Sequence, residues 1–185
     1  MVKLGHDGLQ DHDAGLADFA GGLVSIEPIL QADYERLDRP CLQADWMVRG
    51  VWEGDKVTLF DEHIIDADAT CYRQANLTLK AISNRAAQAK KAKYQGLAEE
   101  LRASFTPLLC STECVLHVES SAYLKTLACK LAMKWQRKYS VVMGWVRART
   151  QFAIIRAVDL RLRGTRRRFV GFHRPNGSVL EGHLY

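Results

Sequence analysis

The sequence predicts an α/β protein in which a helix, three strands, a second helix and a fourth strand follow one another (αβββαβ), with further helices at the C-terminal end. Three observations lead to this prediction. Apolar stretches of strand length, bounded by turn residues, follow a first helical segment over residues 1–66. A segment rich in Ala, Lys, Gln, Leu and Glu, which are good helix formers, covers residues 77–104. From residue 120 onward, apolar residues recur at helical spacing.

The N-terminal elements come first. The segment DGLQDHDAGLADFAGGL (7–23) has apolar residues near helical spacing, and Gly21 and Gly22 signal the end of that helix. The stretch LVSIEPIL (23–30) follows as a short or edge strand, because Pro28 cannot donate a ladder hydrogen bond. CLQADWMVRGVW (41–52) is the second strand. The turn at Gly54 and Asp55 then predicts a hairpin between this strand and KVTLFDEHIID (56–66).

The second half is mainly helical. The helix at 77–104 leads into FTPLLCSTECVL (105–116), a fourth strand that we expect to start after Pro107. Two helices follow, over about 120–136 and 139–164. In the last of them, five apolar residues repeat at helical spacing and predict its apolar face: Val141, Trp145, Ala148, Phe152 and Ile155.

Length and composition fit one globular unit. The chain has 185 residues, 48% of them hydrophobic and 25% charged, as in soluble proteins. We expect a core over 1–120, a basic helical extension packed on it over 121–168, and a tail over 169–185. No apolar run approaches the roughly 18 residues of a membrane span, and the polar start is unlike a secretory signal. Five cysteines without regular spacing favour a reducing, intracellular compartment.

Charge is segregated along the chain. Residues 1–129 hold 13 Lys and Arg against 19 Asp and Glu, whereas residues 130–185 hold 13 against 2. Such a basic segment indicates a polyanionic partner, nucleic acid first and an anionic membrane surface second, although it also suits a solubilising tail. The predicted DNA-backbone contacts are the basic residues of the last helix and the triplet after it: Arg149, Arg156, Arg163, Arg166, Arg167 and Arg168. The triplet also fits a nuclear-localisation patch.

Polar groups interrupt one predicted strand, LFDEHIID (59–66). Alternation cannot hide Asp61, Glu62 and His63 together, because successive side chains of a strand point to opposite faces. Asp45 lies on the neighbouring strand, so Asp45 and Asp61 could form a carboxylate pair that holds Mg²⁺. Such an ion activates water and neutralises charge at a phosphodiester.

The residues also resemble a known family. An acid on one strand, Asp-x-basic on the next strand, and a following helix with KKAKY (90–94) resemble the PD-(D/E)xK, or restriction-endonuclease-like, nuclease superfamily. More specifically, the chain is similar to the endonuclease domain associated with reverse transcriptase in eukaryotic non-LTR retroelements. HDGL, RPCLQADW, FDEHIIDADATCYR, FTPLLCST and the tail GWVRARTQFAIIRAVDLRLRG carry this resemblance, over about residues 6–165. It implies a mixed four-stranded sheet flanked by helices.

The resemblance implies roles for five residues. Asp45 stands at the first metal-binding acid and Asp61 at the second, with Mg²⁺ or Mn²⁺ as the cofactor. His63 occupies the place of the strand lysine. Lys90 and Lys93 match the lysines that the family carries on the helix instead, where they would orient the phosphate or the nucleophile.

The sequence departs from the family pattern at three positions. Ala44 replaces the proline before the first acid, Glu62 stands where an apolar residue is expected, and Cys114 stands where a glycine is expected. The last two departures suggest a drifted copy of the element.

The resulting hypothesis is a metal-dependent DNA endonuclease domain of retroelement origin, located in the nucleus, with DNA and the RNA of the same element as partners. One alternative is a non-catalytic nucleic-acid-binding remnant of a reverse-transcriptase polyprotein. A second alternative is a helical protein-interaction module, in which the row of Arg149, Arg156 and Arg163 packs internally or against a partner protein.

Overall fold

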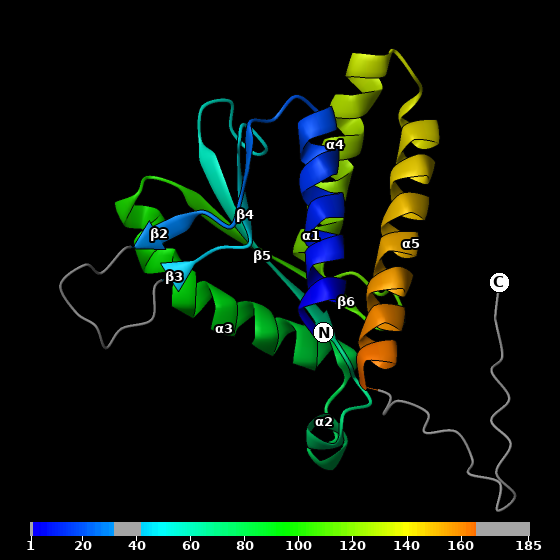
Figure 1. Ribbon diagram of the computed structural model, residues 1–185. Coiled ribbons are helices and arrows are strands. Elements are labelled where there is room, and N and C mark those ends of the chain that lie inside the picture. Colours follow the sequence, from blue (N-terminus) through cyan, green and yellow to red (C-terminus); the bar gives the residue numbers. More distant parts are fainter. Residues whose placement is uncertain (1, 32–41, 166–185) are drawn as a thin grey trace, which may run out of the picture.

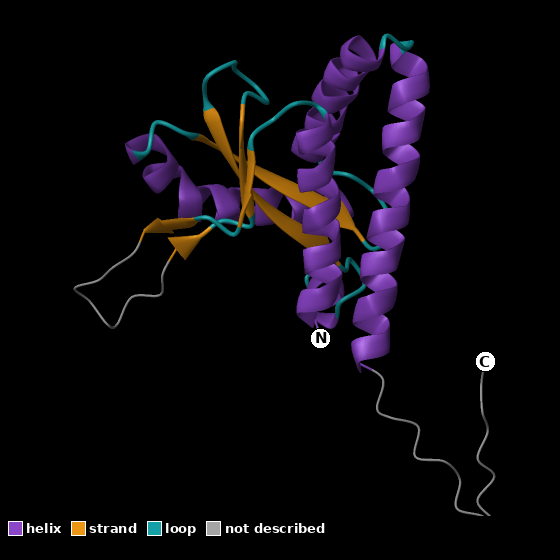
Figure 2. Cartoon of the chain, turned by 45° about the horizontal axis from the view of Figure 1, so that its top comes forward, coloured by secondary structure: helices purple, strands orange, loops and turns teal. Residues whose placement is uncertain are grey.

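A four-stranded mixed sheet with helices on both faces forms the centre of the molecule, as Figures 1 and 2 show. The computed structural model describes residues 2–31 and 42–165. Its elements are α1 (Val2–Phe19), β1 (Val24–Ile26), β2 (Ile29–Gln31), β3 (Leu42–Gln43), β4 (Trp46–Arg49), β5 (Val57–Ile65), α2 (Thr70–Gln74), α3 (Leu79–Glu100), β6 (Ser104–Ser111), α4 (Val118–Trp135) and α5 (Tyr139–Thr165).

The strand order of the main sheet is β1-β4-β5-β6. β4 pairs with both β1 and β5 in antiparallel register, and β5 pairs with β6 in parallel. The α/β class, the hairpin across Gly54 and Asp55 and the C-terminal helical region are therefore as the sequence predicts. The expected second strand is divided into β3, which pairs with β2, and β4, with a bend at Ala44 and Asp45. The short helix α2 has no counterpart in the prediction.

Helix α1 ends at Phe19, just before Gly21 and Gly22, whose backbone conformation and small size allow the turn into β1. Gly21 adopts φ +91°, which a glycine reaches without strain. A Cβ at Gly22 would lie 2.4 Å from Cγ2 of Val48 and 3.1 Å from the carbonyl oxygen of Ala17. The chain can therefore turn from α1 to β1 only if the backbone passes directly against β4.

β6 begins earlier than predicted, at Ser104, and Pro107 lies inside it rather than before it. This correction has a local reason. β6 is an edge strand, and its residues Leu109 and Ser111 turn their backbone groups to the outer side, where they bond to His117 and Val115. Pro107 has the same parity, so its missing N–H faces outward and costs no ladder hydrogen bond with β5.

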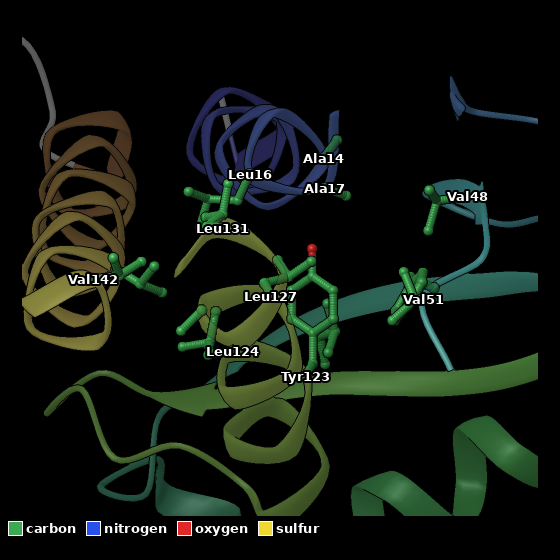
Figure 3. Close-up of a cluster of buried hydrophobic side chains, with 14 of the residues drawn as sticks. Ala14, Leu16, Ala17, Val48, Val51, Tyr123, Leu124, Leu127, Leu131 and Val142 are labelled. Atoms are coloured by element: carbon green, nitrogen blue, oxygen red, sulfur yellow. The ribbon is translucent and has the colours of Figure 1, made fainter. Parts of the chain in front are cut away.

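The main core lies between one face of the sheet and the helices α1, α4 and α5 (Figure 3). Trp46 of β4 stacks on Phe60 of β5 with ring centroids 4.1 Å apart, and Tyr123 of α4 packs against both rings. The opposite face packs against α3 through a smaller cluster that includes Leu59 and Ala98. The two faces of β5 therefore meet different helices.

The predicted apolar face of α5 is wrong. Val141, Phe152 and Ile155 are exposed, at 63%, 72% and 54% of their surface. The buried residues of this helix are instead Val142, Met143, Val146, Thr150, Ile154 and Ala157. α5 carries two apolar stripes on opposite sides, and periodicity alone cannot tell which of them meets the core.

Candidate active site

Asp45 lies in the bend before β4, and its backbone fixes its position. Its N–H donates to the Phe60 carbonyl (3.1 Å), and its carbonyl accepts from the N–H of Glu27 (2.7 Å). The side chain then turns toward β5, where Oδ2 accepts a hydrogen bond from the backbone N–H of Glu62 at 2.6 Å. His6 of α1 holds the same oxygen, with Nε2 at 3.1 Å. Two elements, β5 and α1, therefore orient this carboxylate.

Asp61 lies in the middle of β5 and is 7% exposed. Its carboxylate faces α3: Oδ1 accepts a hydrogen bond from the Tyr94 hydroxyl (2.9 Å), and Oδ2 forms an ion pair with the ammonium group of Lys90. Lys90 also lies 3.4 Å from the carbonyl oxygen of Glu62. A buried charge is tolerated when it is paired and hydrogen-bonded in this way.

Both acids therefore gather around one short piece of β5. Asp45 contacts the N–H of Glu62, and Lys90 contacts the Glu62 carbonyl as well as Asp61. Burial lowers the pKa of Lys90 to about 8, as does the neighbouring charge of Lys93, while Asp45 acts in the opposite direction. The structure thus brings together three of the predicted site residues: Asp45, Asp61 and Lys90.

The other predicted lysine lies one step away from the acids. Lys93 is exposed, and its Nζ lies 3.0 Å from the Tyr94 hydroxyl and 4.5 Å from the centre of that ring. Tyr94 is itself buried, within hydrogen-bond distance of both Asp61 and the Gln43 carbonyl (2.9 Å each). Lys93 therefore reaches Asp61 only through the tyrosine.

Two histidines, His6 and His63, lie near the acids, and only His63 is predicted from the sequence as a site residue. His63 lies two residues after Asp61 on β5, is exposed, and has a pKa lowered by partial burial and by the charge of Arg161. His6 makes the direct contact with Asp45, and the hydrogen bond to that carboxylate raises the pKa of His6. The HDGL motif contains His6, but sequence alone does not place this helix beside the bend.

Glu62 points to the face opposite Asp61, as alternation predicts. It is 3% exposed, and its Oε1 accepts a hydrogen bond from Nε1 of Trp46 at 3.1 Å. Burial, together with the charges of Asp13 and Asp45, raises its pKa well above the ordinary range. The Glu62 side chain is therefore part of the core, and it does not belong to the Asp45–Asp61 cluster.

The predicted arginines lie on a different part of the molecule. Arg149, Arg156 and Arg163 are exposed on α5. Arg149 lies 4.9 Å from the centre of the Trp145 ring, and Arg163 forms an ion pair with Asp159 at 2.8 Å. Their contact with DNA stays a prediction. The triplet Arg166, Arg167 and Arg168 lies outside the described residues.

The described residues contain no group of three or more His, Cys, Asp and Glu side chains that could hold a metal ion. Within residues 2–31 and 42–165, no helix has the length and apolar character needed to cross a membrane. No protein-family model matches the chain, and no curated protein is found to be similar to it.

Proposed function

We propose that the Asp45–Asp61–Lys90 cluster is a metal-dependent phosphodiesterase site that acts on DNA. One observation carries the proposal: Lys90 of α3 forms an ion pair with Asp61, while Asp45 bonds to the very next peptide N–H of β5. Two carboxylates and a partly buried lysine, held around one peptide unit, supply the groups that hydrolysis of a phosphodiester requires. The order of the sheet and its helices is consistent with the restriction-endonuclease-like core that the resemblance implies.

The donor set suits Mg²⁺ or Mn²⁺. Asp45 and Asp61 offer hard carboxylate oxygens, and the His6 imidazole, whose pKa is raised, and the Lys90 ammonium already lie against them. Mg²⁺ is usually held by one or two protein carboxylates, with water and substrate phosphate filling its other positions. Asp45 and Asp61 would therefore hold the ion, which would supply an activated water and charge neutralisation at the phosphate.

The remaining residues have supporting tasks. The Tyr94 hydroxyl and the Glu62 N–H fix the orientations of Asp61 and Asp45, so the carboxylates need little rearrangement. Lys90, with a pKa of about 8, can hold a phosphate oxygen or transfer a proton near neutral pH. Lys93 is exposed beside these groups and would contact the DNA backbone. A retroelement origin and a nuclear location complete the proposal.

Plasmid nicking in the presence of Mg²⁺ or Mn²⁺ tests the proposal. Asp45→Asn and Asp61→Asn should each reduce the nicking rate at least about 100-fold, because several kcal/mol of charge stabilisation is lost. Asp55→Asn is the matched control, since this acid is exposed in the β4–β5 turn. Circular dichroism establishes that the variants are folded. Equal nicking by wild type and Asp61→Asn would reveal a contaminating nuclease and refute the proposal.

One observation favours the non-catalytic alternative. Lys90 pairs with Asp61, and His6, whose pKa is raised, holds Asp45, so the cluster can be stable without a metal ion. A nucleic-acid-binding remnant would bind duplex DNA with an affinity that falls steeply with salt concentration, and would show no nicking with either metal.

A further inference from the structure

The outer side of α5 carries an apolar stripe that the described residues, 2–31 and 42–165, leave uncovered. Val141, Ala148, Phe152 and Ile155 are all exposed, and Phe152 retains 72% of its surface. Their separations of seven, four and three residues place them on one side of a helix, which turns about 100° per residue. The stripe extends over roughly 21 Å, at about 1.5 Å per residue.

This stripe lies opposite the side of α5 that meets the core. Val142, Val146, Ile154 and Ala157 are buried there against the rest of the protein. Figures 1 and 2 both show α5 as the outermost helix, beyond α1 and α4 as seen from the sheet. A helix that is apolar on two opposite sides is suited to lie between two layers. The described chain provides only one of these layers.

The spacing of the stripe suits a second helix. Val141, Ala148 and Ile155 are seven residues apart, and Phe152 continues a parallel series that begins at Trp145. These are the two seam positions of a heptad repeat, whose side chains insert between those of a facing helix. Trp145 is half-buried, because it packs edge-on against Trp135 with ring centroids 5.1 Å apart. It therefore gives the seam one position of fixed orientation, between Val141 and Ala148.

Charge selects the kind of helix. Arg149 and Arg156 each follow a seam residue directly, and neither forms an ion pair within the part of the chain that the structure describes. In a heptad repeat this flanking position faces the flank of the partner helix. A second copy of this chain would meet the arginines with the same arginines when antiparallel. When parallel, it would offer uncharged residues such as Gln151.

We propose that the outer face of α5 binds an amphipathic helix of a partner protein whose apolar seam is flanked by Asp or Glu. The apolar stripe and the arginine row beside it, Arg149 and Arg156, form one surface, and an acidic amphipathic helix complements both parts. DNA would use the arginines but would leave Phe152 and Ile155 without a partner, because phosphate contacts come from basic and polar groups. This inference is independent of the proposed phosphodiesterase site.

The test uses the full chain and two designed helical peptides of 28 residues. Both have Ile and Leu in the seam, and the flanking positions carry Glu in one and Lys in the other. Fluorescence anisotropy of the labelled peptides should show binding of the Glu peptide at least about tenfold tighter than that of the Lys peptide. Equal affinities, or no binding of either peptide, would overturn the proposal.

Surface variants locate the binding. The double variant Phe152→Gln, Ile155→Gln should weaken the Glu peptide more than tenfold. The double variant Arg149→Gln, Arg156→Gln should weaken binding of the Glu peptide about three- to tenfold. The affinity that remains should depend less on salt concentration than that of wild type. Met133→Gln is the matched control, because this apolar side chain is 69% exposed on α4, outside the stripe.

Two further outcomes would contradict the proposal. In the first, wild type binds a short DNA duplex but neither peptide, and the arginine double variant no longer binds the duplex. This outcome would assign Arg149 and Arg156 to DNA binding. The other is a wild-type dimer in analytical ultracentrifugation that Phe152→Gln, Ile155→Gln converts to monomer, since this makes a second copy the occupant.

Discussion

Replacing one buried acid should stabilise this protein, and the gain should grow with pH. Asp13 of α1 is 6% exposed, and its Oδ1 accepts no hydrogen bond within the described structure, although Nε2 of His12 lies 3.9 Å away. His12 cannot compensate the acid at neutral pH, because burial lowers the pKa of His12 to about 4. The Asp13 carboxylate is therefore buried without a countercharge, and burial raises its pKa to about 7.

The size of the effect follows from the pKa change. The ordinary pKa of 3.8 rises to about 7 on folding, and each unit corresponds to about 1.4 kcal/mol. Below pH 3.8 the acid is protonated in both states and adds no penalty. As the pH rises toward 7, the unfolded chain releases this proton while the folded chain keeps it. Stability is therefore lost over this interval, by about 4 kcal/mol in total.

Urea unfolding at pH 5, 6, 7 and 8 measures this loss. Asn cannot ionise, so the free energy of unfolding of Asp13→Asn should exceed that of wild type by an amount that grows about 1.4 kcal/mol per pH unit up to pH 7. Asp18→Asn serves as the control, because Asp18 is exposed on the same helix. A difference between Asp13→Asn and wild type that does not change with pH would refute the reasoning.

Three other predictions concern packing and the site. Gly22→Ala should lower the free energy of unfolding by about 1–3 kcal/mol, measured by urea titration, since its Cβ would overlap the Val48 side chain. Tyr94→Phe should lower it by about 1–3 kcal/mol and reduce nicking, because Asp61 loses a buried hydrogen bond; unchanged values of both would contradict the assigned role. The Cys110 thiol, buried and with a pKa raised by that burial, should react with a maleimide only after unfolding, as peptide mapping would reveal.

Local signals in the sequence predicted much of the sheet. The turn at Gly54 and Asp55, set between two apolar runs, specifies the β4–β5 hairpin, and the paired glycines end α1. Asp45 and Asp61 could be identified as candidate site residues from the sequence, because a carboxylate within an apolar strand is costly to bury unless it has a partner. Their proximity then follows from hairpin register, in which Trp46 lies opposite Phe60.

What the sequence could not provide depends on tertiary packing. The apolar face of α5 was misassigned because both of its sides are apolar, so the spacing of Phe152 fits a core position as well as Ile154 does. His6 lies beside Asp45 only because α1 packs on the sheet, and no pattern within α1 encodes that contact. The burial of Asp13 was likewise invisible, since aspartate in an amphipathic helix is normally solvated.

The placement of α1 has a consequence for how the chain folds. α1 is synthesised before α4 and α5, yet it packs against both of them: the Asp13 carbonyl accepts a hydrogen bond from Tyr123, 110 positions later, and His12 contacts Thr150, 138 positions later. Closing loops of this length costs roughly 4 kcal/mol of chain entropy, so the β4–β5 and α4–α5 hairpins, with their short loops, should form earlier. α1 then docks as a late step, and at mildly acidic pH this step takes up a proton, because the pKa of Asp13 rises from 3.8 to about 7 when the side chain enters the core.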